Sequence, residues 1–153
     1  MEGINDRIEA AVRGENPRLL IKMKSGFAVI GDTQFLPGYC VLLGYPKAYC
    51  LNELDEQHRK EFLFDMSLIG DAITDICDPL RINYDILGNT ETFLHAHIFP
   101  RYAWEEETKR KKPVWKYPKE MWEIDEYQFS EEKHGEMKEE LAKRLEQLIR
   151  IYY

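Results

Sequence analysis

Two histidines near the middle of the chain are the residues whose types and spacing best suit chemistry. His95 and His97 alternate with Leu94, Ala96 and Ile98, and a two-residue period is typical of a β-strand. Successive side chains of a strand point to opposite faces, so both imidazoles should lie on one face. At a rise of roughly 3.3 Å per residue they are about 7 Å apart, close enough to contact adjacent atoms of one substrate.

The residues that follow the pair define the end of this predicted strand. Proline cannot donate a hydrogen bond to a neighbouring strand, so we expect the strand to end at Pro100. Arg101 comes next and provides a fixed positive charge just past the imidazoles.

The histidine pair also has structural and metal-binding interpretations. A lone histidine is more often structural, and this interpretation suffices for His58 and His134. A His-x-His pair can supply two ligands of a catalytic zinc, but no further His, Cys or HExxH pattern lies at a useful spacing. We therefore expect no metal site and favour catalysis at phosphorus.

Length and composition set the broad class of protein. The 153 residues, 44% of them hydrophobic, suffice for one domain over 1–153 with a buried core. We expect no membrane partner, because no run approaches the roughly 20 apolar residues of a membrane span and no signal peptide is recognisable. Three cysteines without a CxxC pair suit a reducing, cytoplasmic location. A net charge of −7 argues against nucleic acid as a partner, but not against a small phosphorylated ligand.

Hydrophobic periodicity predicts an α+β domain. We expect helices over 2–13, 56–77 and from 131 onward, and strands over 19–24, 27–31, 39–43, 81–87 and the histidine segment. Asp55 and Ser130 are the expected N-caps of the second and third helices, and Asp78-Pro79 ends the second. Residues 100–129 show no period and are expected to be irregular. Strands joined in hairpins favour an antiparallel sheet with one long packed helix, plus N- and C-terminal helices.

These elements and three stretches of sequence resemble the histidine triad superfamily of nucleotide hydrolases and transferases. The stretches are Phe35-Leu-Pro-Gly-Tyr-Cys-Val-Leu-Leu43, Tyr45-Pro-Lys47 and Leu94-His-Ala-His-Ile-Phe-Pro-Arg-Tyr102. The resemblance covers about 17–102, leaves 103–153 as a C-terminal extension, and is strongest to bacterial members described as diadenosine tetraphosphate hydrolase-like. It implies a HIT-like fold that binds a small-molecule nucleotide.

The family pattern His-φ-His-φ-His-φ-φ has three histidines, whereas this chain has two. Aligned on the Pro-Arg that follows, Phe93 takes the first position, His95 the central one and His97 the third. Aligned on the first histidine, His97 becomes central and Phe99 takes the third position. We prefer the Pro-Arg alignment, because in relatives the two apolar residues after the third histidine run directly into Pro-Arg.

Two further positions depart from the family. Tyr39 stands where relatives commonly have histidine after Pro-Gly. Gly31 stands where relatives often carry an acidic or amide residue for the ribose, so the adjacent Asp32 is the candidate ribose ligand.

The resemblance implies a role for each catalytic candidate. His95 would attack the α-phosphorus through one ring nitrogen, while the other nitrogen donates to the backbone carbonyl of Phe93. His97 would donate to a phosphate oxygen or to the leaving group. Asn89 would bind the bridging oxygen, although a turn residue explains it equally well. Phe93, Asp32 and Arg101 complete the set as substrate-binding residues.

The activity implied is hydrolysis of a phosphoanhydride in a dinucleoside polyphosphate through a nucleotidyl-histidine. A nucleoside phosphoramidase, a nucleotidyl transferase and a nucleotide-binding module without turnover remain alternatives. We expect no resident cofactor, and whether Mg²⁺ accompanies the substrate stays open. The run Lys109–Lys112 either contacts distal phosphates or is simply solvated.

Family members are mostly two-fold dimers, and the helix over 56–77 offers a surface for such contact. Leu63 and Leu68 lie off its main apolar stripe. We therefore expect a homodimer through this helix or the neighbouring sheet edge.

Overall fold

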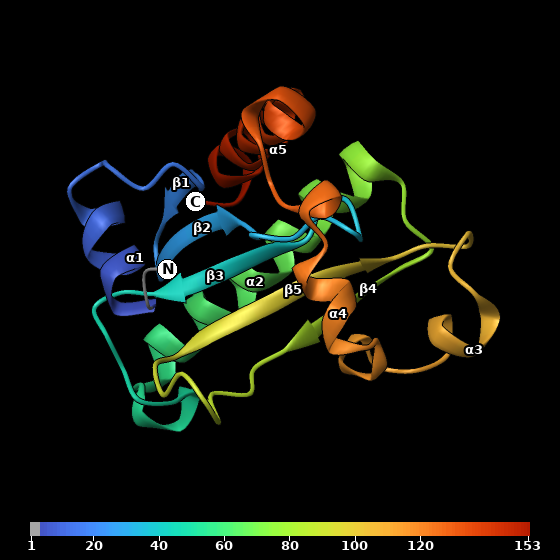
Figure 1. Cartoon of the computed structure of the whole chain (residues 1–153). Coiled ribbons are helices and arrows are strands. Elements are labelled where there is room, and N and C mark those ends of the chain that lie inside the picture. The colour runs from blue at the N-terminus through green and yellow to red at the C-terminus, as the bar shows by residue number, and fades with distance from the viewer. Residues whose placement is uncertain (1–3) are drawn as a thin grey trace.

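The computed structural model describes residues 4–153, and the structure is built on one five-stranded antiparallel sheet of order β1-β2-β3-β5-β4 (Figure 1). The strands are β1 (Leu19–Met23), β2 (Gly26–Ile30), β3 (Cys40–Gly44), β4 (Arg81–Asp85) and β5 (His95–Arg101). β5 lies between β3 and β4, and His97 is paired with Val41 on one side and Asp85 on the other. The predicted antiparallel α+β fold is therefore confirmed.

The histidine strand does not end at Pro100, contrary to our expectation. β5 pairs with β3 only as far as Ile98, whereas its pairing with β4 continues to Arg101. Beyond Ile98 the strand has a neighbour on one side only. Proline is tolerated where one side of a strand is open, and β5 therefore continues through it.

Two long helices cover one face of the sheet. These are α2 (Glu56–Cys77) and α5 (Glu131–Tyr152), which pack against each other and against the strands. Asp55 caps α2 through the His58 amide at 2.9 Å, and Ser130 caps α5 through the Lys133 amide at 3.2 Å, as predicted. Asp78 ends α2 in the left-handed region at φ 49°. The core between helices and sheet includes Ala28, Ile30, Leu42, Ala96, Ile98, Ile69, Ile73, Leu141 and Leu145.

The N-terminal helix and the segment 103–129, the part of the extension before α5, cover the opposite face. Helix α1 (Ile4–Val12) ends before Gly14, which adopts φ 74°, and the predicted start of this helix at residues 2 and 3 lies outside the described residues. Ile8 is fully buried in a second apolar cluster with Val29, Val41 and Phe99. This face carries both histidines.

We expected the segment 100–129 to be irregular, but it forms short helices. These are α3 (Glu107–Arg110), η2 (Val114–Lys116), α4 (Lys119–Glu123) and η3 (Asp125–Tyr127). Helices of three to five residues are too short to show a hydrophobic period, and they persist here because tertiary contacts hold them. A further short helix, η1 (Leu51–Glu53), precedes α2.

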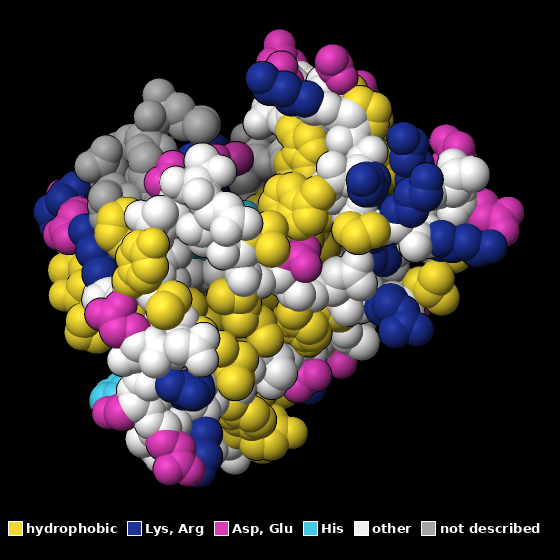
Figure 2. All heavy atoms as spheres, turned by 90° about the horizontal axis from the view of Figure 1, so that it is seen from below, with side chains coloured by type: hydrophobic (Ala, Val, Ile, Leu, Met, Phe, Trp, Pro, Cys, Tyr) yellow, Lys and Arg dark blue, Asp and Glu magenta, His cyan; other side chains and the backbone are white. Residues whose placement is uncertain are grey.

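Exposed hydrophobic side chains lie on α2 and at the β4 edge of the sheet. Leu63 is 38% exposed, Leu80 62% and Tyr84 40%, and hydrophobic side chains gather over the middle of the face seen in Figure 2. We expected Leu68 to contribute to a docking surface, but its side chain is fully buried within the chain and does not. None of the helices in the described part of the chain has the length and apolar character needed to cross a membrane.

We expect two chains to associate through this surface. Leu63→Glu should lower the mass measured by light scattering at micromolar concentration from two chains toward one, because an interface would have to bury the new carboxylate. Val12→Glu, at an exposed position of α1, is the matched control and should leave the mass unchanged. A wild-type protein with the mass of one chain would contradict the expectation.

Candidate active site

His95 is held by the backbone just before its own strand. The side chain is 5% exposed, and its Nδ1 lies 2.6 Å from the carbonyl oxygen of Phe93. A carbonyl can only accept, so Nδ1 carries the proton and the lone pair of the neutral ring lies on Nε2. This tautomer leaves Nε2 as the nitrogen that can attack an electrophile.

His97 lies next to His95 in an aromatic environment. The two imidazole rings meet edge to face, with 5.0 Å between their centroids. Phe99 stacks on His97 at 5.8 Å, and the Trp115 ring approaches it edge-on at 5.1 Å. The Tyr39 hydroxyl oxygen lies 2.8 Å from His97 Nδ1.

Burial sets the protonation state of both members of this contact. It lowers the pKa of His97 from 6.5 to about 4, with a smaller contribution from His95, so the imidazole is neutral at pH 7. Burial raises the pKa of the Tyr39 phenol, and nearby Asp32 raises it further, so the hydroxyl keeps its proton. We infer that Tyr39 donates to Nδ1, which places the His97 proton on Nε2.

Tyr39 depends on the absence of a side chain at position 31. A Cβ added to Gly31 would lie 2.2 Å from the Tyr39 ring, far inside van der Waals contact. The ring is also stacked on Phe99, with centroids 4.2 Å apart. The two departures from the family pattern, Gly31 and Tyr39, are therefore one structural feature: the larger ring occupies the space that a side chain at position 31 would need.

Three adjoining pockets meet at the histidines. A pocket of about 510 Å³, with an apolar floor that includes Val29, Val41 and Leu43, extends from His97 toward the segment 122–128. A second, of about 470 Å³, contains both histidines and Trp115. A third, of about 390 Å³, continues from His95 past Phe93. Such an apolar recess beside convergent polar groups is typical of a small-molecule site.

Most of the predicted site residues line these pockets. Asp32 lies at the boundary between the apolar pocket and the histidine pocket. Asn89 is exposed in the loop between β4 and β5 and borders both pockets that contain His95. Phe93 contributes its carbonyl, while its ring faces the ammonium group of Lys47 at 5.4 Å.

Arg101 lies apart from the histidines and makes a network of its own. It is 3% exposed, and its guanidinium donates from Nε and Nη2 to the Glu105 carboxylate, with Nη2 2.9 Å from Oε1. Nη1 donates to Asn83 at 3.0 Å and to the Lys112 carbonyl at 2.7 Å, and Nη2 also donates to the Lys109 carbonyl at 2.9 Å. Its donors are thus directed at the protein itself, and direct contact with substrate stays a prediction without support from this geometry.

The same network positions the segment that covers His97. Glu105 accepts from the Tyr117 hydroxyl at 2.6 Å, and although burial acts to raise its pKa, hydrogen bonds from Arg101 and Tyr117 lower it. Trp115, two residues earlier, donates from Nε1 to Asp85 at 3.0 Å. Lys109–Lys112 belongs to this network through its carbonyls and borders a different pocket, along β4, rather than the histidines.

Sequence reasoning did not assign roles to Tyr39, Trp115 or Arg7, which all line the histidine pocket or its apolar neighbour. Tyr39 had a signal, since it departs from histidine after Pro-Gly. Trp115 and Arg7 had no such signal, because their proximity to the histidines comes from long-range packing.

No group of three or more His, Cys, Asp or Glu side chains within the described part of the chain is arranged to hold a metal ion.

Solved structures resemble this chain along most of its length, at low identity. A histidine triad protein from Marinobacter aquaeolei VT8 has a TM-score of 0.68 and 22% identity, covering 85% of this chain and 89% of that one. A hypothetical histidine triad nucleotide-binding protein from Sulfolobus tokodaii strain7 has a TM-score of 0.70 and 14% identity, covering 96% and 95%. Diadenosine triphosphate hydrolase from Plasmodium falciparum, in complex with Cyclomarin A, has a TM-score of 0.55 and 17% identity, covering 88% and 78%.

No protein-family model matches the chain, and no curated protein does. The structural likeness nevertheless covers 85% and 96% of this chain in the first two of these comparisons. The chain therefore has the fold of the histidine triad proteins. At these identities the likeness establishes the fold and no particular activity.

The pKa of His97 predicts a pH dependence of stability. Below about pH 6.5 the unfolded imidazole binds a proton, whereas the folded one does not until about pH 4. Proton binding therefore stabilises the unfolded state relative to the folded one in that window. As the pH is lowered from 6.5 to 4, the free energy of unfolding should decrease by up to roughly 3 kcal/mol from this group. Urea unfolding of wild type and His97→Gln between pH 7 and 4 measures the difference, with His58→Gln as the control for an exposed imidazole. Parallel curves for wild type and His97→Gln would contradict the prediction.

The Arg101 network predicts a large stability effect with a specific optical signature. Arg101→Met should lower the free energy of unfolding by about 3–5 kcal/mol, because it leaves the Glu105 carboxylate buried without its partner. Near-UV circular dichroism should also change, since Trp115 loses its support. Arg110→Met is the matched control, because that guanidinium makes a single hydrogen bond, to the Ala103 carbonyl. Equal effects of the two substitutions would show that the network does not position this segment.

Proposed function

We propose that this chain is a nucleotide hydrolase that cleaves a phosphoanhydride of a dinucleoside polyphosphate through a nucleotidyl-histidine on His95. The observation that carries the proposal is the 2.6 Å hydrogen bond from His95 Nδ1 to the Phe93 carbonyl. This bond supports the alignment in which Phe93 takes the first position of the motif, because it needs a backbone oxygen and no histidine side chain. It leaves the Nε2 lone pair of a neutral ring available for attack.

The proposed reaction has two displacements at one phosphorus. His95 Nε2 forms a bond to the α-phosphorus as the bond to the bridging oxygen breaks, and the departing nucleoside polyphosphate takes the electron pair. Water then attacks the same phosphorus and loses a proton to solvent, the electron pair of the breaking P–N bond returns to Nε2, and a nucleoside monophosphate is released with neutral His95 regenerated. His97 stabilises the oxygens of the reacting phosphate by donating a hydrogen bond from Nε2.

The low pKa of His97 favours a phosphoanhydride over a phosphoramidate as the scissile bond. An amine must be protonated to leave from phosphorus, and a neutral imidazole is a weak acid for that step. A nucleoside polyphosphate is a stable anion and leaves without a proton. A buried, neutral His97 therefore suits the hydrolase better than the phosphoramidase.

The pockets around the histidines suit the other parts of a dinucleotide. The apolar pocket next to His97 provides hydrophobic walls for a base, and Trp122 borders it. Asp32, at the boundary with the histidine pocket, would accept from ribose hydroxyls. The loop that carries Asn89 borders the pocket beyond His95, on the side where a leaving group would lie. The nucleotide-binding and diadenosine triphosphate hydrolase descriptions of two structural neighbours are consistent with this assignment.

The nucleophile can be assigned by substitution and trapping. His95→Ala should abolish hydrolysis of diadenosine tetraphosphate, because no other group forms the covalent intermediate. His97→Ala should slow it by about 10²–10³-fold, because the reacting phosphate loses one hydrogen-bond donor. Rapid acid-free quenching with labelled substrate should trap nucleotide on the peptide that contains His95.

The outcomes distinguish the competing functions. Nucleotide trapped on His97 in the His95→Ala protein would show that the other alignment is correct. Faster release of AMP from adenosine phosphoramidate than from diadenosine tetraphosphate would identify a phosphoramidase. Tight binding of diadenosine tetraphosphate by wild type without products would identify a binding module. His134→Ala, far along the chain on α5, is the control and should retain turnover.

A further inference from the structure

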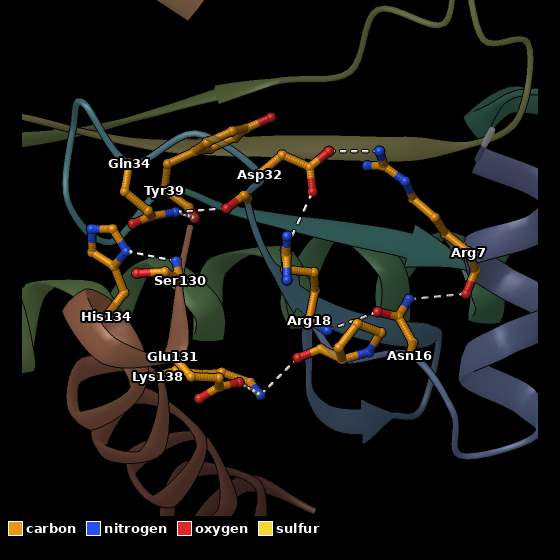
Figure 3. Close-up of polar contacts among 12 residues, drawn as sticks. Arg7, Asn16, Arg18, Asp32, Gln34, Tyr39, Ser130, Glu131, His134 and Lys138 are labelled. Carbon is orange, nitrogen blue, oxygen red and sulfur yellow. Dashed lines mark hydrogen bonds and ion pairs between the residues drawn. The ribbon is translucent and has the colours of Figure 1, made fainter. Parts of the chain in front are cut away.

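Arg7 projects from α1 toward the site, and the helix that carries it is firmly docked. Ile8, the next residue, is fully buried, and the Asn16 side-chain amide donates to the Arg7 carbonyl at 3.0 Å. Figure 3 shows the Arg7 side chain extending from α1 to Asp32, with the ion pair at 2.5 Å. The side chain is 26% exposed and borders both the apolar pocket and the histidine pocket.

The charge of the histidine pocket makes this position unusual. Among the described residues that line it, Arg7 is the single fixed cation, beside the carboxylates of Asp32 and Glu91. Arg101 and the other basic candidates, Arg110 to Lys112, instead border a pocket along β4 that contains neither histidine. A phosphate next to His95 would meet two carboxylates and one guanidinium, so Arg7 is the group that can offset its charge.

Asp32 does not depend on Arg7 alone. Arg18 Nε lies 3.4 Å from the other Asp32 oxygen, below the carboxylate in the view of Figure 3. Arg18 is itself anchored: its amide donates to Asn16 at 2.8 Å, and its guanidinium stacks over Phe129 at 4.4 Å. If Arg7 exchanges one anion for another, the Arg18 guanidinium remains beside Asp32.

We propose that Arg7 binds the phosphate that undergoes attack, and that substrate replaces Asp32 as its partner. The inference rests on the proposed function, since it places this phosphate between His95 and the nucleoside. A guanidinium presents parallel N–H donors that match two phosphate oxygens, which suits it to the charge that builds up there. Release of Arg7 also frees one Asp32 oxygen to accept from a ribose hydroxyl.

The test compares a nucleoside with its 5′-monophosphate by isothermal titration calorimetry. Wild type should bind AMP more tightly than adenosine, and Arg7→Met should reduce that preference by about 10–100-fold, the range for hydrogen bonds to a charged group. Adenosine affinity should change by less than about threefold. Arg18→Met is the matched control: it removes the other guanidinium on Asp32, borders only the apolar pocket, and should retain the preference for AMP.

A second variant covers the case in which Arg7→Met does not fold, as judged by thermal unfolding. Asp32→Asn removes the competing carboxylate, so the AMP-to-adenosine preference should rise. An unchanged preference in Asp32→Asn or in folded Arg7→Met would overturn the role of Arg7 while leaving hydrolysis by His95 intact. If wild type binds neither compound and hydrolyses no dinucleotide, the proposed function fails, and the role of Arg7 fails with it.

Discussion

The buried ion pair between Arg101 and Glu105 is the interaction on which the covered face of the sheet depends. Both side chains are almost fully enclosed, so every donor and acceptor needs a partner inside the protein. Those partners are the carbonyls of Lys109 and Lys112, the hydroxyl of Tyr117 and the amide of Asn83. The segment 103–129 supplies most of these hydrogen-bond partners, so it lies over β5. Its Trp115 side chain thereby reaches His97. Arg101 thus acts indirectly, because it holds the segment that covers His97.

Enclosure has a direct chemical consequence at His97. Tyr39, Phe99 and Trp115 surround the ring and remove it from water, which lowers its pKa and keeps it neutral. A neutral imidazole donates a hydrogen bond from a fixed nitrogen, and which nitrogen carries the proton is set by the Tyr39 hydroxyl. That arrangement requires a glycine at position 31, because any side chain there would displace the tyrosine ring. Specificity for leaving groups that need no proton would follow from packing alone.

Patterns with a local cause were predictable, and those with a distant cause were not. The caps at Asp55 and Ser130 and the two-residue period of the histidine strand depend on neighbours in sequence, and the structure confirms them. The continuation of β5 through Pro100 depends on which strands lie beside it, which no local pattern records. The burial of Leu68 likewise depends on the packing of α2 within the chain, and the helical spacing on its own pointed the other way.

The sequence by itself determined that two imidazoles share one face of a strand, because alternation is a property of extended backbone. It also indicated the order of helices and strands, since hydrophobic periods of two and three to four residues reflect local geometry. Only the tertiary structure decided which charges face those imidazoles. Arg101 is close to the histidines in sequence, but its side chain is directed away from them, toward Glu105. Arg7 is some ninety residues away in sequence, but it reaches the pocket that contains both histidines from α1. The reason is physical: a buried charge must be paired, and the position of its partner is set by packing between distant segments.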